Sequence, residues 1–156
     1  MQFKGQSNLF AGETLKDIFI MAIQTYYAHP PFIALPDLIV PVPLHWKKHS
    51  LRGFNQSAFF AQALSRTFTI PVLNGVKRSR AMTEQKQLNK QRRRHNAKNS
   101  FVISAKSKQR LHNQHVAIVD DVMTTGATVN MLAKALIKAG AASVSVWVLA
   151  RTPKKN

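Results

Sequence analysis

Residues 118–128 place two adjacent carboxylates and a hydroxyl-rich turn between a strand-like run and a helix-like run. The apolar run at residues 116–119 is typical of a strand buried on both faces. Beyond Gly126, apolar residues recur at the spacing of a helix's buried stripe. The order strand, turn, helix puts Asp120 and Asp121 at the carboxyl end of the strand. In an open parallel sheet, ligands bind at this edge.

The turn at residues 124–128 has the chemistry of a phosphate site, because unpaired N–H groups and the helix dipole favour an anion there. Its candidate contacts are Thr124, Thr125, Gly126, Ala127 and Thr128. Asp120 and Asp121 would repel a phosphate at contact. They are expected either to accept hydrogen bonds from sugar hydroxyls or to help hold a Mg²⁺ that neutralises a diphosphate. The alternative is a strand ending in two solvated aspartates before an ordinary threonine-capped helix.

The sequence Val-Asp-Asp-Val-Met-Thr-Thr-Gly-Ala-Thr at residues 119–128 resembles the phosphoribosyl pyrophosphate (PRPP) motif of type I phosphoribosyltransferases. The resemblance implies that Asp120 and Asp121 contact the ribose hydroxyls and that the turn surrounds the 5′-phosphate. Mg²⁺ would arrive with PRPP and lie near the two aspartates, without a direct ligand from the protein.

Further segments are similar to the ComF family of competence proteins, which serve the uptake of external DNA. They are Val40-Pro41-Val42-Pro43, Arg52-Gly53-Phe54-Asn55-Gln56 and the series Thr83, Gln85, Leu88, Arg94, Asn96 and Phe101. ComF proteins commonly begin with a four-cysteine zinc module, whereas this chain has no cysteine. The chain is therefore either a truncated form or a member without that module, and no zinc is expected in it.

The composition sets independent bounds. Lysine and arginine number 23 against six acidic residues, and the formal net charge of +17 attracts nucleic acid, anionic lipid or phosphorylated metabolites. The absence of cysteine excludes disulfides, thiol catalysis and thiolate metal sites. A chain of 156 residues with 45% hydrophobic content is expected to form one domain over residues 1–156. Without a bilayer-spanning run or a signal-peptide layout, a cytoplasmic protein is expected.

Apolar patterns alternate between strand and helix type, which predicts an α/β fold with a mostly parallel twisted sheet and flanking helices. The resemblance makes this fold type I phosphoribosyltransferase-like. Strands are expected at residues 38–40, 72–76, 116–119 and 144–149. A helix is expected at residues 54–68. The side chains expected to face the core are Ala58, Ala61, Leu64 and Phe68.

The first helix is predicted to end before His29 and to bury one apolar stripe. That stripe consists of Leu15, Ile18, Phe19, Ala22 and Tyr26. Residues 1–36 would then form a helical cap, or hood, over a PRPP-binding core at residues 37–151.

Two basic segments follow predicted strands. The loop at residues 43–55 carries Lys47, Lys48 and Arg52, which the resemblance makes candidate ligands for the pyrophosphate of PRPP. The alternative is a basic loop that is merely solvated. The segment at residues 77–98 carries the densest charge with few apolar residues, which predicts a mobile loop or flap.

The charge of this second segment exceeds what one diphosphate needs and suits a nucleic-acid backbone. Its candidate contacts to DNA are Arg78, Arg80, Lys86, Lys90, Arg92, Arg93 and Arg94.

Two functions compete at this point. In one, the protein binds PRPP with Mg²⁺ and single-stranded DNA as a component of DNA uptake. In the other, it is an active phosphoribosyltransferase that acts on a nucleobase or another nitrogenous acceptor and releases pyrophosphate. No residue stands out as a catalytic base, so the sequence leaves turnover open.

The ComF resemblance implies as partners a competence helicase and the inner-membrane DNA transport machinery, and extends the expected location to the inner face of the cytoplasmic membrane. The sequence does not indicate the oligomeric state.

Overall fold

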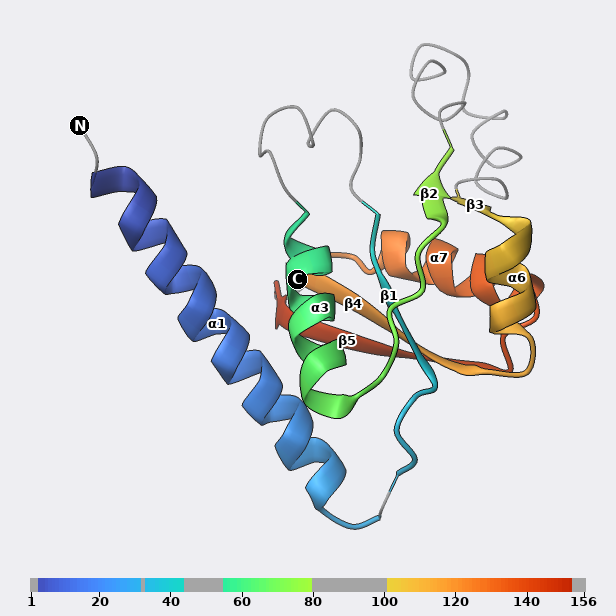
Figure 1. Ribbon diagram of the computed structural model, residues 1–156, viewed down its shortest axis with the longest axis horizontal. Helices are drawn as coiled ribbons and strands as arrows, with labels where there is room; N and C mark the ends of the chain where they lie inside the picture. The colour runs from blue at the N-terminus through green and yellow to red at the C-terminus, as the bar shows by residue number, and fades with distance from the viewer. Residues whose placement is uncertain (1–2, 32, 44–54, 80–100, 153–156) are drawn as a thin grey trace.

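The computed structural model describes residues 3–31, 33–43, 55–79 and 101–152, and side chains from residue 12 onward (Figure 1). A long amino-terminal helix leads into strands and helices that alternate along the chain. The elements are α1 (Phe3–Ala28), β1 (Leu38–Pro41), α3 (Gln56–Phe68), β2 (Val76–Arg78), β3 (Phe101–Ile103), α6 (Ala105–Leu111), β4 (His115–Met123), α7 (Ala127–Lys138) and β5 (Ser143–Arg151).

The central sheet has three parallel strands in the order β1-β4-β5. Leu38 of β1 is opposite Val116 of β4, and Val119 of β4 is opposite Trp147 of β5. The predicted α/β class with a parallel sheet and flanking helices is confirmed. The strand predicted at residues 144–149 is confirmed within β5, which extends beyond it at both ends.

Both faces of this sheet are covered. One face, with Val40 and Ile118, packs against Leu132 and Leu136 of α7. The other face belongs to a second cluster that includes side chains from α1 and α3. Figure 1 shows α3 and α7 on opposite sides of the strands. All four residues at 116–119 are completely buried, which explains why the sequence shows a continuous apolar run there.

Helix α1 ends at Ala28, as predicted, but the predicted buried stripe is largely wrong. Leu15, Ile18 and Tyr26 are exposed. The buried side chains are Phe19 and Ile23, and the Phe19 ring lies edge-on to the Phe60 ring of α3 at 5.7 Å. Ala22 is exposed as well. The docking of α1 on α3 and β5 therefore selects a different face of the helix from the one that the pattern indicated.

Helix α3 confirms the predicted end at Phe68 and begins two residues later than predicted. Ala61 and Leu64 are buried as expected, whereas Ala58 and Phe68 are half-buried. Phe68 still packs against the cluster shared by α1, α3 and the sheet.

The strand predicted at residues 72–76 is wrong in its position. Val72 makes only an isolated parallel bridge with Ile39, and β2 begins at Val76. Pro71 has no N–H to donate, and Gly75 turns the chain with φ +96°. β2 then pairs antiparallel with β3 in a separate two-stranded sheet. β3 and α6 were not predicted.

Within the described part of the chain, no helix has both the length and the apolar character that a membrane crossing requires. The division into a cap at residues 1–36 and a core at residues 37–151 remains a prediction.

Candidate functional site

The site is built where β4 passes into α7. β1 and β4 are parallel, so their carboxyl ends meet at the same edge of the sheet. Asp120 and Asp121 lie near the end of β4, which continues to Met123 because β5 still pairs with it there. The chain after Pro41 leaves from this edge, and Val42 N–H donates to the Val119 carbonyl at 2.9 Å. The sheet therefore presents the acidic pair where a ligand can reach it.

Asp120 is the buried member of the acidic pair, with 9% of its surface exposed. Its Oδ1 accepts a 3.0 Å hydrogen bond from the Ser57 hydroxyl and a 3.1 Å bond from the Asp121 backbone N–H. Burial raises the pKa of Asp120 from 3.8 to about 6; the Ser57 hydrogen bond opposes the rise and the neighbouring Asp121 charge adds to it. Asp120 therefore binds a proton more readily than an exposed aspartate does.

The turn after the strand has an open cradle of backbone groups. Gly126 has φ +73° and precedes α7, whose amino terminus has no side-chain cap. The Thr125 hydroxyl accepts a 3.3 Å hydrogen bond from the Ala127 N–H. A hollow of about 50 Å³ is lined by Asp120, Val122, Met123, Thr124, Thr125, Gly126, Ala127, Thr128 and Val129. Six of the seven residues predicted from the PRPP motif thus line one hollow that suits a small anion, and Asp121 does not line it.

Arg78 joins this turn from a distant part of the sequence. Its guanidinium donates a 3.1 Å hydrogen bond to the Thr128 hydroxyl and lies 5.6 Å from the centre of the Phe101 ring. Burial lowers the pKa of Arg78, and the negative charge of Asp120 opposes that change. Its Nε is buried without a hydrogen-bond partner among the described residues. Arg78 therefore brings a partly desolvated positive charge to the turn.

The other predicted basic contacts lie outside the described residues. These are Lys47, Lys48 and Arg52 of the first basic loop, and Arg80, Lys86, Lys90, Arg92, Arg93 and Arg94 of the second. At the end of the first loop, Asn55 Nδ2 donates to the Val42 carbonyl at 3.2 Å. Asn55 Oδ1 is buried and has no partner in the described segments.

Sequence reasoning missed Ser57 and the role of Arg78 at the turn. Ser57 is buried in the first turn of α3, 63 residues before Asp120. The only signal was its position directly after the Arg52-Gly53-Phe54-Asn55-Gln56 segment, and that segment does not indicate where the hydroxyl points.

The fold and the site define a type I phosphoribosyltransferase-like domain. Residues 55–156 match the phosphoribosyl transferase domain family. Glutamine PRPP amidotransferase from Bacillus subtilis, solved with ADP and GMP, aligns with a TM-score of 0.58 over 89% of this chain and 26% of that one, at 18% identity. At this identity, the likeness concerns the fold alone.

Closer relatives narrow the class. Competence protein F of Haemophilus influenzae is 40% identical over 152 residues, which are 96% of this chain and 65% of that protein. DNA utilization protein YhgH of Escherichia coli K12 is 44% identical over 121 residues, which are 77% of this chain and 52% of that protein. The chain belongs to the ComF family of proteins with a phosphoribosyltransferase domain. It spans between about half and two thirds of the length of these relatives.

Proposed function

We propose that this chain binds PRPP with Mg²⁺ at the β4–α7 turn, binds single-stranded DNA, and serves the uptake or utilisation of external DNA. One observation carries the proposal. A buried and a half-buried carboxylate are followed by a left-handed glycine that offers α7 no side-chain cap, and Arg78 is bonded to the turn. Paired carboxylates suit ribose hydroxyls, and the uncapped turn suits a phosphate.

The residues fit PRPP part by part. The N–H groups and hydroxyls of residues 124–128 would hold the 5′-phosphate, and Arg78 would add charge beside Thr128. Asp120 and Asp121 would accept hydrogen bonds from the ribose. Mg²⁺, when bound with PRPP, neutralises the diphosphate and orders it. Lys47, Lys48 and Arg52 are retained as proposed contacts of the pyrophosphate.

The proposal for DNA rests on charge and on the relatives. The chain carries a formal net charge of +17, far more than a diphosphate ligand requires. Two relatives are named for competence and for DNA utilization. Arg80, Lys86, Lys90, Arg92, Arg93 and Arg94 are retained as proposed DNA contacts, whereas Arg78 is assigned first to the phosphate turn. A competence helicase and the inner-membrane transport machinery are the proposed partners, with the inner face of the membrane as the place of action.

Thermal unfolding with PRPP and Mg²⁺ tests the PRPP-binding half of the proposal. A ligand at 100 times its dissociation constant stabilises the fold by about 2.7 kcal/mol. In a domain of this size, that corresponds to a rise in Tm of about 5–10 °C. Ribose 5-phosphate should give part of this rise, because it reaches the turn and the aspartates. No rise at millimolar PRPP would contradict the proposal.

Phosphoribosyl transfer is the second candidate function, favoured by the buried carboxyl group of Asp120, which lines the hollow at the phosphate turn and whose pKa is raised by burial. A carboxyl group that titrates near neutral pH can exchange a proton during catalysis. In the reaction, the bond from C1 of the ribose to pyrophosphate breaks and a bond from C1 to an acceptor nitrogen forms. Incubation with PRPP, Mg²⁺ and a panel of nucleobases, followed by an assay for pyrophosphate, distinguishes turnover from binding alone.

A further inference from the structure

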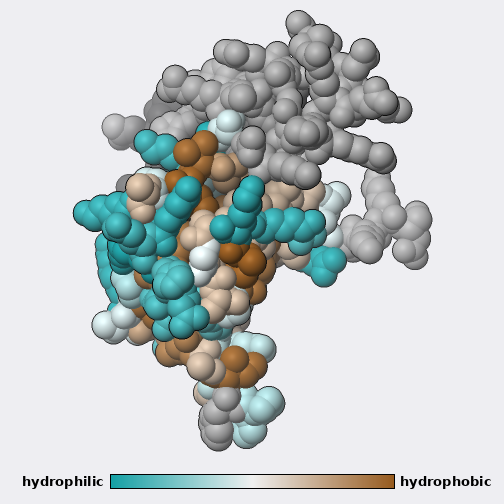
Figure 2. Space-filling view, turned by 90° about the vertical axis from the view of Figure 1, so that its right-hand side faces the viewer, coloured by the Kyte–Doolittle hydropathy of each residue, from teal (hydrophilic) through white to brown (hydrophobic). Residues whose placement is uncertain are grey.

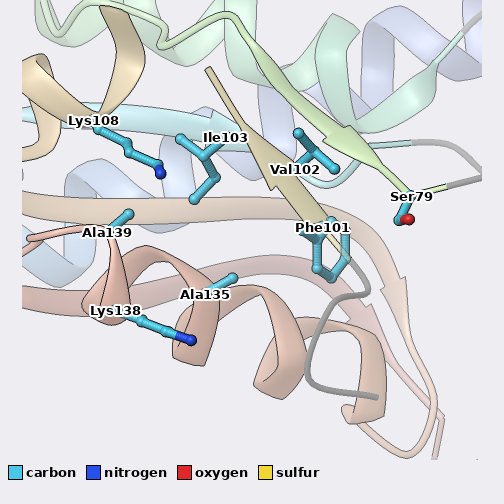
Figure 3. Close-up of a pocket in the computed structure, with 8 residues that line it drawn as sticks. All are labelled: Ser79, Phe101, Val102, Ile103, Lys108, Ala135, Lys138 and Ala139. Carbon is cyan, nitrogen blue, oxygen red and sulfur yellow. The ribbon is translucent and has the colours of Figure 1, made fainter. Parts of the chain in front are cut away.

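A groove of about 490 Å³ lies beside the candidate site, between β3 and the helices α6 and α7. It is open to solvent and is called the α6–α7 groove below. Among the described residues, eight line it, namely Ser79, Phe101, Val102, Ile103, Lys108, Ala135, Lys138 and Ala139 (Figure 3). None of these eight residues belongs to the PRPP motif.

The groove has an apolar wall and a basic rim. Ile103 and Phe101 come from β3, and Val102 between them is 57% exposed although it is apolar. Lys108 reaches the groove from α6 and Lys138 from α7 (Figure 3). None of the described residues that line it is acidic. A ligand that fits this lining has an apolar planar part and a negative charge.

The surface around the groove has the same mixed character. Figure 2 views the molecule from the side that carries α6, and hydrophobic surface there is bordered by hydrophilic surface. Helices α6 and α7 contribute the cations Lys106, Arg110 and Lys134 in addition to the two lysines of the groove, and neither helix contains an acidic residue. Favourable charge therefore continues beyond the groove itself.

Phe101 connects the groove with the candidate PRPP site. One residue lines the groove and also lies beneath the guanidinium of Arg78, which is bonded to Thr128. The two sites are therefore adjacent, and they share the packing of a single aromatic ring. From this ring the groove continues along α7 towards its carboxyl end, away from the phosphate turn.

We propose that the α6–α7 groove binds single-stranded DNA, with backbone phosphates against Lys108 and Lys138 and bases against the apolar wall at Phe101 and Ile103. The proposal rests on the proposed DNA binding and gives it a location in the described part of the chain. Single strands fit better than duplex, because only unpaired bases can lie on an apolar wall. A nucleotide chain fits better than an acidic peptide, because it pairs each charge with a planar apolar group.

Lys108→Ala combined with Lys138→Ala is the variant that tests this placement. The matched control is Lys106→Ala combined with Lys134→Ala, which removes the same charge from exposed positions on the same two helices. Binding of a fluorescent oligothymidylate is measured by anisotropy from 50 to 300 mM salt. If two phosphates are contacted, single-strand counterion release predicts a slope of log affinity against log salt that is shallower by about 1.4. At 0.1 M salt this corresponds to an affinity about 25-fold weaker.

The control pair is expected to change affinity less than threefold. Equal losses of DNA affinity in both pairs would overturn the proposed site in the groove, and a diffuse positive field would then be the cause of binding. If the wild type does not bind the oligothymidylate at all, the proposed DNA-binding function fails, which is a different result from failure of the groove.

Competitors in the same assay identify the occupant. Excess duplex of equal length should compete less well than unlabelled single strand, and polyglutamate or free thymidine monophosphate should compete poorly. Displacement by polyglutamate as effective as by single-stranded DNA would overturn the nucleic-acid assignment. Val102→Glu supplies an independent variant, because a carboxylate at this exposed lining position should repel the phosphates of the strand. Ile137→Glu, at an exposed position of α7 that does not line the groove, is its control.

Discussion

The hydroxyl of Ser57 donates a 3.0 Å hydrogen bond to Oδ1 of Asp120, and both side chains are buried. This contact ties the first turn of α3 to the carboxylate that the site offers to a ribose. The hydrogen bond also lowers the pKa of Asp120, and so opposes burial, which raises this pKa to about 6.

Ser57→Ala should raise the pKa of Asp120 above 6, because the hydrogen bond that favours the ionised form is lost. PRPP affinity at pH 7 should fall by roughly fivefold, in line with a net hydrogen-bond contribution of about 1 kcal/mol. The loss should shrink at pH 8.5, where Asp120 is ionised in both proteins. Carbon NMR of the carboxyl group measures the pKa directly, and Ser65→Ala on the same helix is the control.

Asp120→Asn should stabilise the fold at neutral pH while it weakens PRPP binding. The folded pKa of about 6 lies above the ordinary value of 3.8, so the stability that this group contributes is present below pH 3.8 and is lost as the pH rises through 6. Asparagine never ionises, which makes the variant more stable than the wild type above pH 6 by up to about 3 kcal/mol. Urea unfolding at pH 4 and pH 8 checks this. A variant that is less stable than the wild type at pH 8 contradicts the account.

Gly126→Ala should impair both stability and PRPP binding. Its φ of +73° is strained for alanine, although the new Cβ would meet Met123 Sδ at an ordinary 3.4 Å. The backbone strain should cost about 1–2 kcal/mol. Gly140→Ala is the matched control, because Gly140 also has positive φ but follows the far end of α7. We expect destabilisation in chemical unfolding from both changes, larger for Gly140→Ala because its φ of +110° is further from the left-handed region, and loss of PRPP affinity only from Gly126→Ala.

The strand, acidic pair, turn and helix at residues 115–138 could be predicted because their signals are local. Ser57 and Arg78 could not be placed, since they reach the site only through tertiary contacts with Asp120 and Thr128. The face of α1 was mispredicted for another reason. Apolar residues occur around much of that helix, so only its docking through Phe19 decides which side is buried.

Arg78→Met should weaken PRPP binding by tenfold or more, because a hydrogen bond involving a charged group contributes about 1.5–3 kcal/mol. Methionine keeps an apolar side chain over Phe101 while it removes the bond to Thr128. Arg66→Met removes the same charge from an exposed position in the last turn of α3. Calorimetric titration should separate the two variants; the same small loss in both would mean that Arg78 acts only through the general field.

Calorimetric titration of PRPP with Mg²⁺ into the wild type and into Asp120→Ala/Asp121→Ala tests the central claim most directly. The account predicts saturable binding with one site per chain in the wild type, and no detectable heat of binding in the double variant. Circular dichroism establishes that both proteins are folded. A folded wild type that takes up no PRPP, or a double variant that binds it as tightly as the wild type, would contradict the account.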